Sequence, residues 1–261
     1  MQNNHKRKTV SFQMLGFEFR KVIGNPYVHI FGVGMPVLMM IIITRAVMSQ
    51  VAGRAMLEEA NTSVFLGIGA LIPMATIFMG YGVSNAQEME KGIPQRMELF
   101  GIRAGVSICN RILSEIIFMI LAFLVYFGVG YAAVDLKAPT LSGGLLYLVC
   151  IFSFSVILFC LSHAISSLLR KFSLTYCVTM LLYFGMMVLG GMMGISYDNM
   201  PPAVQTVAKL LPVTYINRDF YIVWKGESYN FMPMLQSYLL MAAIAGIAIV
   251  FTIKRTERKL H

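Results

Sequence analysis

Six long blocks of apolar residues limit the fold of this 261-residue chain more than any other feature. Each block runs for about 18 residues or more with almost no charge, which is the length that an α-helix needs to cross a bilayer. Apolar runs in the strands of soluble α/β domains last only about 4 to 8 residues. Only 13% of the residues are charged, about half the share of an ordinary soluble domain. The sequence therefore predicts an all-α polytopic membrane protein.

We expect the six blocks to form transmembrane helices within a single domain, because no repeat or low-complexity tract divides the chain. Arg170 and Lys171 separate the fourth block from the fifth, since two charges interrupt the apolar run where a turn is needed. The expected spans are residues 27–44, 63–83, 112–134, 141–165, 173–195 and 232–253.

The lysines and arginines give the expected orientation. Residues 1–26, 84–111, 166–172 and 254–261 carry 15 of the 21 basic residues, and the segments on the opposite side carry 6. Because basic residues collect on the cytoplasmic side of membrane proteins, both termini are predicted to lie in the cytoplasm, at the cell membrane. The net charge of +9 then follows from topology and predicts no nucleic-acid partner.

Residues 9–25, a segment that combines apolar and charged residues, precede the first span. Its charged residues, among them Arg20 and Lys21, lie around the part of the helix surface that the apolar residues leave free. Such a helix is expected to lie in the membrane interface, with its basic face toward the lipid headgroups. Asn25-Pro26 should end it, because a residue before proline avoids the helical region. The apolar face consists of Phe12, Leu15, Phe19, Val22 and Ile23.

The stretch 84–103, between the second and third spans, is the most informative loop, because its roughly twenty residues are far more than a minimal connector needs and are densely charged. Four of its apolar residues recur at helical spacing, namely Met89, Ile93, Met97 and Phe100. This spacing predicts a short amphipathic helix parallel to the membrane, which Pro94 either kinks or begins. The pattern leaves two interpretations open. One is a docking helix that fits a groove on a soluble partner, and the other is a solvated loop whose charges only fix the topology.

This loop resembles a known family. Glu88-x-Glu90-x-Gly92, followed by Arg96 and an apolar stretch, looks like the acidic loop of ABC-2-type permeases. Other motifs, in the right order around six spans, extend the resemblance over nearly the whole chain. They are Arg20-Lys21-x-x-x-Asn25-Pro26, Pro36 in the first span, and the series Met200-Pro201, Leu211-Pro212, Arg218 and Lys225-Gly226 before the last span.

The resemblance implies the membrane subunit of an exporter, paired with a second permease subunit as a homodimer or heterodimer. Each subunit would bind a cytoplasmic ABC ATPase and move a hydrophobic or amphipathic substrate outward, such as a drug, an antibiotic peptide, a lipid or a glycan. The acidic loop would be the coupling helix seated on that ATPase. The docking residues implied are Glu88, Met89, Glu90, Lys91, Gly92, Ile93 and Arg96.

The chain has no phosphate-binding loop of the form Gly-x-x-x-x-Gly-Lys-Ser/Thr, so it cannot hold ATP in that way. We therefore predict a transport subunit without an ATPase site or a cofactor of its own, with ATP and Mg on the partner subunit. The alternatives are a gradient-driven secondary transporter and a membrane scaffold or sensor subunit that transports nothing.

Arg111 and Glu115 lie four residues apart, at the expected cytoplasmic end of the third span. One interpretation is an ion pair at the membrane boundary. Another, which groups them with Arg20 and Lys21, is a contact that passes movement of the coupling helix to the spans. A proton relay would need a carboxylate deep in a span, and we expect none. This expectation argues against gradient-driven transport.

Gly190 and Gly194 form a small-x-x-x-small pair near the end of the fifth span. The pair permits a close helix contact, or it loosens the outer end of this span. Beyond them, Pro201-Pro202 is expected to open a short helix that ends at Pro212. This helix either dips into the outer leaflet or is an ordinary surface helix. No metal site is predicted, because the four cysteines lie in or beside apolar blocks and lack short paired spacings.

The charge asymmetry can be tested by labelling. In a chain whose four native cysteines are replaced by serine, Glu90→Cys should react with a membrane-impermeant maleimide only after the cells are opened. Lys137→Cys, in a loop of the opposite set, should react in intact cells. Labelling of Glu90→Cys from outside the cell would contradict the predicted orientation.

Overall fold

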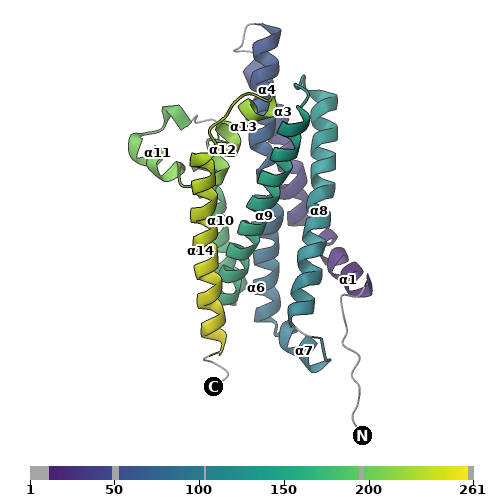
Figure 1. Cartoon of the computed structure of the whole chain (residues 1–261). Helices are drawn as coiled ribbons and strands as arrows, with labels where there is room; N and C mark the ends of the chain where they lie inside the picture. The colour runs from purple at the N-terminus through teal and green to yellow at the C-terminus, as the bar shows by residue number, and fades with distance from the viewer. Residues whose placement is uncertain (1–11, 49–52, 103, 194–196, 258–261) are drawn as a thin grey trace.

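The computed structural model describes residues 12–48, 53–102, 104–193 and 197–257, and over these residues it contains helices and no strand (Figure 1). Six helical segments are long and apolar enough to cross a membrane, which confirms the all-α polytopic fold. They are Ile30–Met48, Arg54–Glu90, Gly105–Ala133, Leu141–Leu169, Phe172–Leu189 and Met232–Lys254.

The second span is the central helix of the bundle. Of its most apolar stretch 83% is buried inside the protein, against 33% or less for the other five spans. Pro73 has no N–H to donate, so the ordinary hydrogen-bond ladder is interrupted, and wider π-helical turns follow it. In order, the span consists of α4 (Arg54–Gly69), α5 (Leu71–Pro73), the π-helical η2 (Met74–Tyr81) and α6 (Gly82–Glu90).

The other spans surround this helix. The first span packs against α4 and α8, the fourth against η2, α6 and α14, and the fifth against α6. An additional helix, α1 (Phe12–Ile23), packs along α8 at one end of the bundle (Figure 1). The surrounding elements are α2 (Pro26–His29), π-helical η1 (Ile30–Gly34), α3 (Met35–Met48), α8 (Ala104–Ala133), α9 (Leu141–Leu169), α10 (Phe172–Leu189) and α14 (Met232–Glu257).

A tyrosine from α9 completes the backbone hydrogen bonding of the central helix. The N–H of Ala70 bonds to the carbonyl of Gly67 at 3.1 Å, so the helix tightens there. The carbonyl of Leu66 instead accepts a hydrogen bond from the hydroxyl of Tyr147, at 2.9 Å. Because a buried carbonyl without a partner is costly, this contact fixes where α9 lies along the central helix.

The predicted spans differ from the observed helices at their ends. The second span was expected at 63–83, but its helix continues to Glu90. The third span was expected from 112, but α8 begins at Ala104. Polar residues outside the membrane core still form helix when no glycine or proline stops them, so apolar length did not mark these ends. The fifth helix, in contrast, ends early at Leu189.

The loop between these two spans is also organised differently from the prediction. A single amphipathic helix through Met89, Ile93 and Phe100 is wrong, because α6 ends at Glu90 and a separate helix, α7 (Ile93–Leu99), follows. Pro94 lies in the first turn of α7, which is one of the two roles that the sequence left open.

At the opposite end of the bundle, Pro212 begins a helix, whereas we expected it to end one. Proline is favourable in a first helical turn, and here it opens α12 (Pro212–Arg218), which packs against α4. Next, α13 (Phe220–Trp224) packs against α4 and α9, and the indole N–H of Trp224 donates to the carbonyl of Lys137 at 2.9 Å. The segment therefore returns into the bundle, whereas α11 (Pro202–Ala208) stands beside it (Figure 1).

Two neighbouring glycines at the start of α9 make a matched test of this packing. A Cβ on Gly143 would lie 2.6 Å from the carbonyl oxygen of Val223 and 2.7 Å from that of Trp224, whereas the nearest contact of a Cβ on Gly144 is 3.5 Å. We expect Gly143→Ala to destabilise the protein by about 1–3 kcal/mol through overpacking, and Gly144→Ala to be neutral or slightly stabilising. Thermal unfolding in detergent measures both, and equal apparent Tm values would contradict the close approach of α9 and α13.

Candidate functional site

Two glycines shape the turn between the second and third spans. Gly92 has φ 67° and Gly101 has φ 78°, which glycine adopts without the cost that a side chain would impose. The first glycine ends α6 and leads into α7, and the second leads toward α8. As a result, α7 lies beyond the ends of α6 and α8, at the tip of the bundle (Figure 1).

Behind α7, the guanidinium of Arg111 on α8 joins three helices. Its Nη1 donates to Oδ1 of Asn85 on α6 at 2.9 Å, and its Nη2 forms an ion pair with Glu88 on the same helix. Its Nε lies 3.5 Å from Oε2 of Glu18 on α1. The side chain is buried, so these partners replace the water that a cation otherwise requires.

Lys21 on α1 closes the arrangement. Its ammonium lies 2.8 Å from Oε2 of Glu18 and also forms an ion pair with Glu88. Burial lowers the pKa of Lys21, and the nearby positive charge of Arg111 lowers it further, while Glu18 acts in the opposite direction. We refer to Glu18, Lys21, Glu88, Arg111 and Glu115 as the charged cluster.

The cluster corrects two expectations from the sequence. Glu88 was expected to be exposed on the loop, but it is 6% exposed and paired with Lys21 and Arg111. An ion pair between Arg111 and Glu115 was one interpretation, but Arg111 pairs with Glu18 and Glu88 instead. Glu115 is buried, and its Oε2 has no hydrogen-bond partner among the residues that the structure describes.

The interfacial helix also differs from the prediction. We expected its basic face to point to lipid headgroups, and Arg20 is indeed exposed, but Lys21 points into the cluster. Burying two carboxylates against α8 without cations would be costly, which explains why Lys21 turns inward. Residues 9–11 of the predicted helix lie outside the described residues.

Glu90 has a role that no local pattern predicts. It is exposed, and its Oε2 accepts a hydrogen bond of 2.8 Å from the backbone N–H of Phe172, the first residue of α10. The first N–H groups of a helix have no partner within the helix, so this carboxylate acts as an N-cap supplied from a distant part of the chain. It connects the end of α6 to the fifth span.

One side of α7 is free. Leu99 is 86% and Phe100 is 80% exposed, and Arg96 and Glu98 beside them are also exposed. Ile93 is partly buried. Two large apolar side chains among charges, at the tip of a bundle, are typical of a surface that binds another protein. Of the remaining predicted docking residues, Lys91 is exposed, and Met89 and Gly92 are partly buried.

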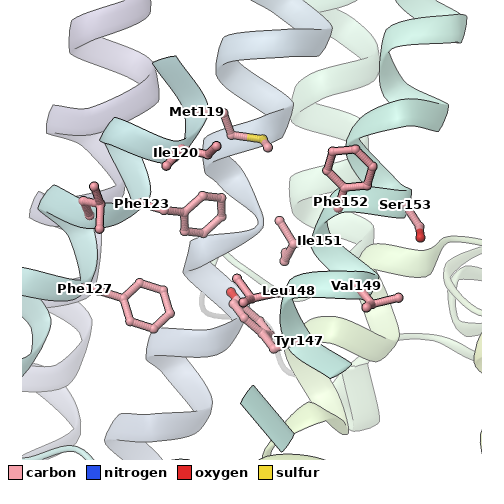
Figure 2. A pocket seen from close by; sticks show the side chains of 11 residues that line it. Met119, Ile120, Phe123, Phe127, Tyr147, Leu148, Val149, Ile151, Phe152 and Ser153 are labelled. Atoms are coloured by element: carbon pink, nitrogen blue, oxygen red, sulfur yellow. The ribbon is translucent and has the colours of Figure 1, made fainter. Parts of the chain in front are cut away.

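A pocket of about 620 Å³ lies between α8 and α9 on the side of the bundle (Figure 2). Phe123 and Phe127 lie on one side of it, and Tyr147 and Ile151 on the other. The lining is almost entirely apolar, since the hydroxyl of Tyr147 is occupied by the carbonyl of Leu66. The pocket suits an apolar group and offers no polar anchor besides Ser153.

The predicted glycine pair is described only in part, because Gly194 lies outside the described residues. Gly190 directly follows α10, and a Cβ there would lie 3.1 Å from Cγ1 of Val213 on α12. Its carbonyl accepts a hydrogen bond of 2.8 Å from Asn217. The nearest atom to this Cβ is the carbonyl oxygen of Met186 in α10 itself, at 2.9 Å, so the close contact of Gly190 with another element is with the returning segment. The packing of the pair stays a prediction.

Comparison of the sequence with known families assigns the chain to one of them. The family described as ABC-2 type transporter matches residues 10–221, which include α1, the charged cluster and α7. The chain belongs to the ABC-2 type transporter family. No curated protein and no solved structure matches it significantly.

This ABC-2 family member is thus a multi-pass membrane protein and a permease subunit of an ABC transporter. Permeases of the family have no ATPase domain of their own and typically work with an ABC ATPase.

The contribution of Arg111 to the stability of this permease can be tested by comparison with Arg96, an exposed arginine on α7. Arg111→Met leaves three buried carboxylates with one cation, so we expect a loss of about 3–5 kcal/mol in stability. Arg111→Lys should give an intermediate loss, because an ammonium cannot reach three partners in the planar geometry of a guanidinium. Arg96→Met, at an exposed site, should change stability by less than about 0.5 kcal/mol. The apparent Tm of each purified variant is the measurement, and equal values for Arg111→Met and Arg96→Met would contradict the role assigned to Arg111.

Proposed function

We propose that the chain is the membrane subunit of an ATP-driven exporter and that α7 is the coupling helix that docks on a separate cytoplasmic ATPase. The observation that supports this most is the contrast between the two sides of α7. One side carries exposed Leu99 and Phe100, and the other packs against α6 and α8, which the charged cluster joins to α1. Family membership supports the kind of partner.

In this proposal docking depends on α7 itself and not on Glu88. Phe100 and Leu99 would enter an apolar groove on the ATPase, as exposed apolar residues of a short helix do in other complexes. Arg96 and Lys91 are exposed beside them and would face acidic or polar groups. ATP and Mg would bind the partner, which supplies the energy.

Movement of α7 would reach the spans by three connections. The chain itself connects α7 to α6 and α8. Glu88 on α6 and Arg111 on α8 connect these two helices to α1, and Glu90 at the end of α6 connects to α10. Because breaking a buried ion pair costs several kcal/mol, α1, α6 and α8 would move together at this end. ATP binding by the partner would then favour one arrangement of the spans over another.

The proposed cargo is hydrophobic or amphipathic and leaves the cell. The apolar pocket between α8 and α9 supports the substrate class, because such a lining binds apolar groups without selecting polar ones. A second permease subunit would complete the pathway, with both termini of each subunit in the cytoplasm.

Docking can be tested by comparing two exposed apolar residues at opposite ends of the bundle. Phe100→Ser should weaken the complex with the candidate ATPase at least tenfold, about 1.4 kcal/mol, and should reduce substrate-stimulated ATP hydrolysis in parallel. Met56→Ser, which changes a residue that is 65% exposed on α4, should leave both unchanged. Co-purification and ATPase assays in lipid nanodiscs measure the two effects.

Three results would oppose the proposal. Equal binding of both variants would remove α7 from the interface. Uptake of substrate into vesicles without ATP, abolished by an ionophore, would support a gradient-driven transporter. Binding of the ATPase without any substrate-dependent stimulation would support a scaffold or sensor subunit.

A further inference from the structure

The charged cluster contains more negative than positive groups. Three carboxylates, Glu18, Glu88 and Glu115, face two cations, Lys21 and Arg111. Glu18 is 1%, Glu88 is 6% and Glu115 is 4% exposed. If all five groups were ionised, the cluster would hold one uncompensated negative charge away from water, which is an expensive arrangement.

The contacts show which carboxylate lacks compensation. Arg111 directs its three nitrogens to Glu18, Asn85 and Glu88, and Lys21 lies between Glu18 and Glu88. Glu115 forms no ion pair with a described residue, and its Oε2 has no hydrogen-bond partner there. It is nevertheless close enough to interact electrostatically with Arg111, Glu18 and Lys21.

Glu18 Oε1 and Asn110 Oδ1 are buried without a hydrogen-bond partner among the described residues, but both are oxygens that bring no cation. The titratable rings near this part of α8 already have partners. The guanidinium of Arg111 lies 5.7 Å from the centre of the Tyr81 ring, and the Tyr81 hydroxyl is hydrogen-bonded to Nδ1 of His163 on α9 at 2.7 Å. On α2, His29 packs against Phe118, one turn from Glu115, and its Nε2 lies 2.6 Å from the carbonyl oxygen of Ile23. None of these groups brings a further cation to Glu115.

We propose that Glu115 is a proton-binding site, occupied at neutral pH. The proton makes this carboxyl neutral, so that the ionised Glu18 and Glu88 are balanced by Lys21 and Arg111. The sequence argued that no carboxylate lies deep in a span, because the third span was expected to begin at 112. That expectation stays a prediction. The helix itself begins earlier, at Ala104, so Glu115 lies eleven residues into α8, about 16 Å from its start, with part of this length outside the membrane core.

The proton makes the contact of α1 with the bundle dependent on pH. Loss of the proton places a net negative charge where α1, α6 and α8 meet, so alkaline conditions weaken this contact. In linkage terms, the folded chain binds one proton more than the unfolded chain at neutral pH, so stability falls as the pH rises. This site is independent of the proposed docking of α7, and the proton is held there and is not transported.

Infrared spectroscopy of the full chain in lipid nanodiscs tests the proposal without any ATPase. A neutral carboxylic acid has a carbonyl band separate from the bands of carboxylates. At neutral pH we expect this band in the native chain and in Asp135→Asn, a control at an exposed carboxylate, and its loss in Glu115→Gln. Glu115→Asp should keep the band and shift its frequency, because the carbonyl then belongs to a different side chain.

A second measurement, the pH dependence of the apparent Tm, distinguishes loss of the proton-binding site from misfolding of the variant. The apparent Tm of the native chain should fall between neutral and alkaline pH, and that of Glu115→Gln should fall less, whereas Asp135→Asn should follow the native chain. A band that persists in Glu115→Gln would overturn the proposal. A band whose frequency is unchanged in Glu115→Asp would place the proton on another carboxyl, Glu18 in particular, and would also overturn it.

Discussion

The guanidinium of Arg111 is the interaction on which one end of this protein depends. It is buried, and it reaches an amide and a carboxylate on α6 and a carboxylate on α1 from a single position on α8. A planar group with donors in fixed directions can hold three helices at set angles, which a flexible ammonium cannot do. The polar end of the second span can therefore remain helical and packed up to Glu90, and the position of α7 follows from it.

Apolar length was enough to predict the six spans and the fold class, because the bilayer requires each span to satisfy its own backbone hydrogen bonds. The ends of the helices were less predictable. Residues 84–90 continue the helix because no glycine or proline stops them before Gly92, whereas the ion pairs of Glu88 with Lys21 and Arg111 join residues distant in sequence and no local pattern could show them. The glycines were the usable signal for where the helices end, since Gly92 and Gly101 adopt positive φ angles. The chemistry of Pro212 allows it either to begin or to end a helix. It begins α12, which packs against α4.

The acidic motif of the loop was recognisable, but the roles of its two glutamates were not. Glu88 and Glu90 are two residues apart on α6, so their side chains point in different directions. Glu88 is buried against α1 and α8, and Glu90 accepts a hydrogen bond from the first N–H of α10. Both are contacts within the chain. A motif rich in charge can thus serve the internal structure of a membrane protein as much as its surface, and the contacts of each side chain, not its charge, distinguish the two uses.

The glycines on either side of α7 have an evolutionary consequence. Both adopt a left-handed backbone, and the helix between them contributes no side chain to the ion pairs of the charged cluster. Substitutions at the exposed positions 95, 96, 98, 99 and 100 can therefore accumulate without disturbing the bundle behind them, whereas Met97 is partly buried. If α7 docks the ATPase as proposed, two such permeases could diverge after gene duplication in the companion they recruit while their spans stayed the same, and exchange of this short segment would reassign one to the other.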